Sequence, residues 1–330
     1  TARQIRAGLL RLATTCRGGA SVFPVGKPGG KQRVVWNGTR VSAAAATPPK
    51  PLHLADPACF ALLDLQAGRQ LRVTKRDCRT WFDQLAVDDH IGAFFGRPGL
   101  SDDEIRQAGG DDNSGEFVPC SRVWPMGFAW SSCVAQATLM GICAASGLTE
   151  DLVLAANLPL PADLSLVFAV ATDDLMIFSD STDDTTEVAA KRVERVMLDN
   201  GIAKKTDNDI NGSLSATRVG VDLIDGRFWA PPPSRIWRHI DAITDLASSG
   251  VGSRGGVAGF LGSAQWFDLL RRLRLSVFDN VYDFSSGERA KDWTRLGIPK
   301  LVIGELLLDP VFSLFGRVDM QLPFLPMIGA

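Results

Sequence analysis

The sequence predicts an α+β protein built around an antiparallel β-hairpin, with a helical C-terminal third. Two apolar runs, residues 166–170 and 175–178, flank a short polar link, which is the pattern of a β-hairpin. After the three consecutive prolines at 231–233, the composition shifts to helical patterns. A length of 330 residues exceeds one minimal domain, so we expect two or three packed subdomains.

The composition narrows the function classes. Hydrophobic residues make up 45% of the chain, charged residues 22%, and the mean hydropathy is +0.06, all typical of a globular protein. The net charge of −2 argues against binding nucleic acid through overall basicity, but basic clusters could still line a local groove. These clusters, which could equally be solvated surface, lie at 27–40, 72–79, 204–205 and 271–274.

Neither a membrane span nor a secretory leader is expected. The most apolar stretch, 152–178, is interrupted by two prolines and three aspartates, which a bilayer would not tolerate. The six cysteines form no CxxC pair, so we expect free thiols and a reducing compartment. An intracellular location, cytoplasmic or nuclear, is therefore predicted.

In the N-terminal half, residues 1–24 are weakly patterned and are taken as an extension. The Gly/Pro/Lys stretch 26–31 predicts a loop before a short strand at 33–36, and its spacing does not meet that of a P-loop. Asp56-Pro57 predicts the start of a helix that reaches Leu65, and residues 71–74 read as a strand. The polar, glycine-rich segment 97–118 reads as an exposed insertion without chemistry.

The remaining elements follow in order. Small apolar residues predict a helix over 129–148, the hairpin occupies 165–179, and a helix follows from the candidate N-caps at 182–184 to Gly201. A strand is expected at 218–223, closed by Asp225-Gly226. Beyond the prolines, helices are expected at 237–247, 257–274 and 301–315.

Two adjacent acids, Asp173 and Asp174, stand at the tip of the predicted hairpin between apolar strands. Paired carboxylates there repel one another, and a divalent cation would compensate them, although a solvated polar turn is an equal alternative. Two further patterns are individually weak: Asp77 ends a strand five positions before Phe82, and Pro125-Met126-Gly127 opens the helix that carries Gln136.

Taken together, the order of these patterns resembles the reverse-transcriptase palm. The resemblance covers roughly residues 25–285 and extends upstream to the strand at Arg33. It implies a right-hand polymerase, with fingers and palm over 25–230 and a helical thumb or connection over 231–330. The segment 260–282 is similar to the thumb of retrotransposon enzymes, in particular DIRS-like ones, and 301–326 to the stretch before an RNase H domain, which implies part of a longer retroelement polyprotein.

The resemblance also implies roles for individual residues. Asp77, Asp173 and Asp174 would hold two Mg²⁺ ions, with Mn²⁺ as a substitute, and Phe82 would exclude a ribose 2′-hydroxyl. The other implied substrate-binding residues are Lys31, Arg33, Gly127, Gln136, Lys204 and Lys205. The implied partners are an RNA or DNA template with its primer, and deoxynucleoside triphosphates.

Three other functions compete with this interpretation. An RNA-dependent RNA polymerase shares the palm, but it normally carries an acid where this chain has Phe82 and a Ser-Gly motif where it has Pro125-Met126-Gly127. A decayed nucleic-acid-binding remnant is also compatible, because Ala171 and Met126 depart from the common motifs, although all three acids are retained. Hydrolase triads and zinc sites are unsupported by the three histidines, none of which has metal-ligand spacing.

Overall fold

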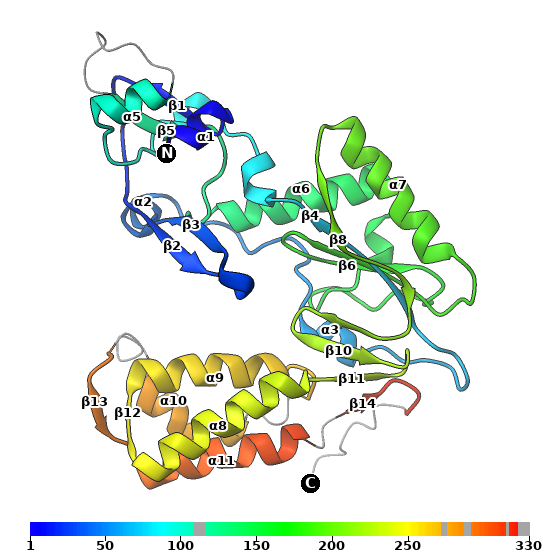
Figure 1. Ribbon diagram of the computed structural model, residues 1–330. Coiled ribbons are helices and arrows are strands. Elements are labelled where there is room, and N and C mark those ends of the chain that lie inside the picture. The colour runs from blue at the N-terminus through cyan, green and yellow to red at the C-terminus, as the bar shows by residue number, and fades with distance from the viewer. Residues whose placement is uncertain (109–116, 272–275, 287–291, 315–316, 323–330) are drawn as a thin grey trace.

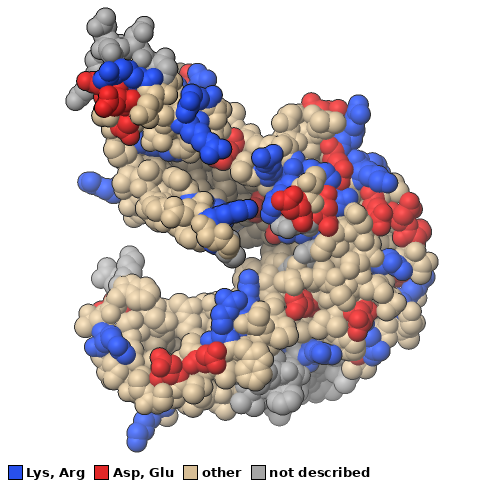
Figure 2. Space-filling model, in the orientation of Figure 1, with Lys and Arg blue, Asp and Glu red and all other residues tan. Residues whose placement is uncertain are grey.

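The structure is a computed structural model that describes residues 1–108, 117–271, 276–286, 292–314 and 317–322. Its elements form three bodies around an open middle: an N-terminal body, a central sheet with helices, and a C-terminal helical body (Figure 1). In the space-filling view, a hollow separates the N-terminal and helical bodies (Figure 2). No helix within the described ranges is long and apolar enough to cross a membrane.

The central sheet is antiparallel throughout and confirms the predicted hairpin. Its order is β6-β7-β4-β8, from Val167–Ala171, Asp174–Ser179, Arg72–Cys78 and Lys204–Ser213. Two helices, α6 (Ser131–Ala145) and α7 (Thr185–Asp199), pack on one face through a core that includes Leu139, Val193 and Ile177. The two helices therefore bury this face of the sheet, and the strand ends beside it remain available for a site.

Strand β4 directs alternate side chains to opposite faces of the sheet. On the helix side, the Thr74 hydroxyl lies 2.8 Å from that of Thr186 in α7, and the Arg76 guanidinium contacts Glu194. On the other side, Val73 joins a second core with Phe60. Because Lys75 and Asp77 follow Val73 at a spacing of two, they lie on the face away from the helices.

A second, four-stranded sheet covers part of that face. Its order is β14-β11-β10-β9, from Val318–Asp319, Phe228–Ala230, Val221–Ile224 and Ala216–Arg218. The single strand predicted at 218–223 is wrong: Val219 (φ 45°) and Gly220 (φ 78°) form a left-handed turn that folds the segment into a hairpin. The helix α3 (Pro57–Ala61) places Phe60 4.6 Å from Trp229, stacked ring on ring, which fastens this sheet to the core.

The N-terminal body is built from short elements. Strand β1 (Leu10–Ala13) pairs with β5 (Val118–Ser121), and β2 (Val22–Gly26) pairs with β3 (Gln32–Trp36) around the 3-10 turn η1 (Pro28–Gly30). The predicted loop and strand at 26–36 are thus one arm of a hairpin whose first strand the sequence did not indicate. The remaining elements are α1 (Ala2–Arg6), α2 (Thr39–Ala44), α4 (Asp89–Gly92) and α5 (Asp102–Gln107).

The helical body confirms the helices expected after the prolines, with shifted ends. It contains α8 (Pro233–Ser249), α9 (Arg254–Asp268), α10 (Asp279–Ser285) and α11 (Lys300–Leu314) around Ile243, Leu261 and Phe278. The helix predicted to reach residue 274 ends at Asp268, and residues 272–274 and 323–326 lie outside the described ranges. The pair β12 (Val251–Ser253) and β13 (Arg295–Gly297), like α10, was not predicted.

Local signals read from the sequence hold at several ends. The Asp56 carboxylate accepts a hydrogen bond from the Ala58 amide at 2.8 Å, as an N-cap of α3 should. Ahead of α7, Asp183 accepts from the Thr185 amide at 3.0 Å. All six cysteines are free thiols, and four of them, Cys59, Cys78, Cys120 and Cys143, are buried.

Candidate active site

The sheet brings the three predicted acids together at one end. Asp77 of β4 lies directly opposite Asp174 of β7, and Ala171 pairs with the same Asp174, so Thr172 and Asp173 form the turn. The Cys78 amide donates to the Asp173 carbonyl at 3.2 Å, which ties the turn to β4. Asp77 and Asp173 line a cleft of about 660 Å³.

Gln136 of α6 holds this turn from behind. Its side chain is fully buried, and its Nε2 donates to the Leu52 carbonyl at 2.9 Å and to the Val170 carbonyl at 3.1 Å. Its Oε1 accepts from the Thr172 amide at 2.7 Å. Gln136, expected to contact substrate, has no exposed surface to do so and instead positions the acidic turn.

The electrostatics of the trio reflect crowding of like charges. Burial, followed by the neighbouring Asp174 and Asp77 carboxylates, raises the pKa of Asp173 from 3.8 to about 6, and Arg33 partly opposes this. Two ammonium groups reach the other acids: Lys75 Nζ contacts Asp174 Oδ1, and Lys205 Nζ lies 3.3 Å from Asp77 Oδ2.

The two adjacent lysines of β8 have different surroundings. Lys205 pairs in register with Asp77, whereas Lys204 pairs with Cys78, so their side chains leave opposite faces. Lys204 Nζ hydrogen-bonds Glu194 at 2.9 Å and Asp209 at 2.7 Å, in an ion cluster with Arg76. Both lysines border the cleft, but only Lys205 has an ion pair with one of the three acids.

Phe82 lies at the cleft beside the acids. The turn begins at Thr80 (φ 43°) and continues as the 3-10 helix η2 (Trp81–Gln84), in which Trp81 is buried and donates from its indole to the Ala135 carbonyl at 3.3 Å. Because Trp81 anchors the turn to α6, Phe82 is held at the cleft wall with its ring half-buried.

Gly127 joins the cleft to the N-terminal body. Its φ is +111°, and a Cβ atom there would stand 2.0 Å from the Trp36 carbonyl oxygen. The Trp36 amide in turn donates to the Met126 carbonyl at 3.0 Å. Gly127 therefore allows β3 to approach closely, and no larger residue fits without displacing it.

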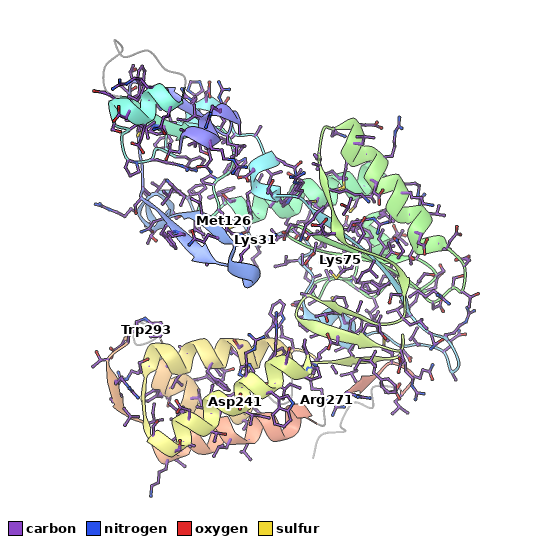
Figure 3. All side chains as sticks on the ribbon, viewed as in Figure 1. Lys31, Lys75, Met126, Asp241, Arg271 and Trp293 are labelled. Carbon is purple, nitrogen blue, oxygen red and sulfur yellow. The ribbon has the colours of Figure 1, made fainter. Side chains whose placement is uncertain are left out.

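Six of the residues that line the cleft are basic. Lys27, Arg33, Arg79, Arg97, Lys204 and Lys205 line it, and basic side chains stand on both sides of the hollow in Figure 2. Lys31, which Figure 3 labels on the N-terminal body across from Lys75, is exposed and is not among the lining residues.

Arg97 is a cleft residue that the sequence did not reveal, because it falls in the segment predicted to carry no chemistry. Its Nη1 donates to Gln4 Oε1 at 2.5 Å, and burial lowers its pKa despite the opposing charge of Asp83. Its neighbours Pro98 and Gly99 give it the local pattern of an ordinary loop, so only the tertiary structure places it at the site.

The three carboxylates suit a hard divalent ion in kind, since all supply oxygen ligands from one end of the sheet. As they stand, however, no three acidic, imidazole or thiol groups within the described ranges are arranged to hold a metal ion. Two of the three carboxylates are bound to Lys75 and Lys205 instead.

Comparison with known proteins gives a likeness of fold. No family model matches the chain, and no curated protein sequence matches it either. Among solved structures, it is similar to the foamy viral protease-reverse transcriptase designated dRH in complex with double-stranded DNA, at 14% identity and a TM-score of 0.60 over 94% of this chain and 46% of that one.

A second structure of the foamy viral protease-reverse transcriptase with double-stranded DNA gives 15% identity and a TM-score of 0.57, covering 94% of this chain and 55% of that chain. The present chain thus spans about half the length of either neighbour. Identities this low speak for the fold alone, and on that ground the predicted class is confirmed: the chain has the right-hand polymerase fold of reverse transcriptases.

Proposed function

We propose that this chain is an RNA-directed DNA polymerase that extends a primer 3′-hydroxyl with deoxynucleoside triphosphates on an RNA or DNA template. The observation that carries the proposal is the register of β4 and β7, which sets Asp77 opposite Asp174, with Asp173 beside them on the turn that joins β6 to β7. The proposed template–primer partner is in keeping with the structural neighbours, which are complexes with double-stranded DNA.

Each residue has a task in this proposal. Mg²⁺, or Mn²⁺, held by Asp77, Asp173 and Asp174 would neutralise phosphate charge and activate the hydroxyl. Arg33, which lines the cleft, would bind the triphosphate by paired hydrogen bonds, and Lys205 would supply a second positive charge beside Asp77. Phe82 lines the cleft, where its ring would accept a deoxyribose and exclude a 2′-hydroxyl.

Gln136 and Gly127 act through other groups. Gln136 fixes the turn that carries Asp173, and Gly127 seats β3, the strand that carries Arg33. Both are positioning residues, because neither has a side chain that reaches the cleft. A retroelement origin, DIRS-like in particular, and membership of a longer polyprotein stay predictions.

The test is primer extension with Mg²⁺ on an RNA template, with deoxynucleotides and ribonucleotides in parallel. We expect extension with deoxynucleotides and its loss in Asp173→Asn. The matched control is Asp184→Asn, in the exposed acid pair Asp183-Asp184 ahead of α7, which should extend as well as the unaltered chain.

Two outcomes would redirect the proposal. Preferential use of ribonucleotides would favour an RNA-dependent RNA polymerase. Binding of template without extension, in a chain whose circular dichroism shows it folded, would favour a non-catalytic nucleic-acid-binding protein.

A further inference from the structure

The acid trio is already partly neutralised by the chain itself. Lys75 Nζ contacts the Asp174 carboxylate with only 12% of the lysine side chain exposed, and Lys205 Nζ lies 3.3 Å from Asp77 Oδ2. Among these five groups alone, three carboxylates and two ammonium groups leave one net negative charge. The lysine charges therefore weaken the electrostatic attraction between these carboxylates and a divalent ion.

The Lys75 contact is fixed by strand register rather than by the reach of a long side chain. Asp77 opposes Asp174, and Lys75 opposes Met176, so Lys75 and Asp174 are diagonal neighbours on the same face. The pairing of β4 and β7 therefore keeps Lys75 within reach of Asp174, while its side chain remains free to turn away. Figure 3 labels Lys75 on the central sheet.

We propose that Lys75 and Lys205 are internal counter-cations, which bind the carboxylate oxygens that a divalent ion needs and keep the metal affinity of the free chain low. Metal binding then requires Lys75 to leave Asp174, and Lys205 to leave Asp77. The inference rests on the proposed function only for the identity of the ion.

Mn²⁺ titration of the purified chain, without nucleic acid or nucleotides, tests the inference, with free Mn²⁺ measured by electron paramagnetic resonance. Removing a positive charge in direct contact with a ligand should strengthen cation binding by about tenfold or more. We expect that gain in Lys75→Met, whose side chain fills a similar volume, and a smaller gain in Lys205→Met, because 38% of that lysine side chain is exposed.

Two controls separate competition from general charge effects. Lys191→Met removes an exposed lysine of α7 on the helix side of the sheet and should bind Mn²⁺ as the unaltered chain does. Adding Asp174→Asn to Lys75→Met should abolish the gain, because the freed oxygen is then no longer anionic.

Unchanged Mn²⁺ affinity in both Lys75→Met and Lys205→Met, with circular dichroism showing folded chains, would overturn the inference. Equal gains in Lys191→Met would overturn it as well, because they would trace the effect to net charge. Since the readout is metal binding, a chain that fails to extend primers but gains Mn²⁺ affinity in Lys75→Met would refute the proposed function alone.

Discussion

Replacing Gln136 by methionine removes the hydrogen bonds behind the acidic turn while preserving side-chain volume. The fully buried Gln136 amide donates to the Leu52 and Val170 carbonyls and, at a longer 3.4 Å, to the His53 carbonyl, and it accepts from the Thr172 amide. Val170 keeps another partner, because its carbonyl also accepts from the Ala55 amide at 2.9 Å.

The variant thus leaves chiefly the Leu52 carbonyl and the Thr172 amide without their partners. An unpaired buried polar group costs about 1–3 kcal/mol, and water can reach both groups in part, so we expect a loss of roughly 2–4 kcal/mol in the free energy of unfolding. Urea denaturation followed by circular dichroism measures it. At a temperature at which the variant remains folded, primer extension should also fall, because the turn that carries Asp173 loses the hydrogen bond that holds it.

The control is Gln66→Met, which makes the same substitution at an exposed position and should change the free energy of unfolding by less than about 0.5 kcal/mol. If Gln136→Met unfolds at the same urea concentration as Gln66→Met, the hydrogen bonds at Gln136 do not hold the turn, and the positioning role assigned to it is refuted.

Three further predictions concern other sites. Gly127→Ala should lower the free energy of unfolding by about 2–4 kcal/mol, because the added Cβ meets the Trp36 carbonyl. The control Gly141→Ala, in α6 where the added Cβ meets open space, should raise it by about 0.5–1 kcal/mol. Equal effects of the two substitutions in urea denaturation would contradict this. Phe82→Ala should increase ribonucleotide incorporation relative to deoxynucleotides, and an unchanged ratio in single-nucleotide extension would remove the steric role. Burial, followed by the charges of Arg235 and Arg238, lowers the pKa of His239 below 6.5. Because the unfolded chain then binds this proton first, the free energy of unfolding should fall as the pH drops below about 6.5. His239→Gln should flatten that pH dependence, and an equally steep fall in the variant would contradict the prediction.

Several parts of the site could be predicted from local sequence. Apolar runs on either side of Asp173 and Asp174 predict a hairpin with acids at its tip, because strand and turn preferences act over a few residues. Asp77 near the end of a strand and Phe82 in the turn that follows are likewise set by local structure, since one strand end and one turn separate them. The helix start at Asp56 follows from capping, and the start of α7 from a turn in which Asp183 accepts from the Thr185 amide, and both interactions are equally local.

The missed elements depend on contacts between distant segments. The strand β8 reads KKTDNDINGS, with one apolar residue in ten, and it is a strand because β4 offers a free edge of backbone hydrogen-bonding groups. The turn at Val219-Gly220 is formed although valine rarely adopts positive φ, and no local rule predicts it.

The sequence by itself indicated the class of fold and singled out the three acids, because local patterns predicted the hairpin and the order of the motifs resembles the reverse-transcriptase palm. Only the tertiary structure decided what surrounds those acids: Gln136 behind the turn, Arg97 in the cleft, and Lys75 and Lys205 on the carboxylates. The physical reason is that strand register and burial bring together residues far apart in the chain, and these pairings decide which charges are neutralised and which face the cleft.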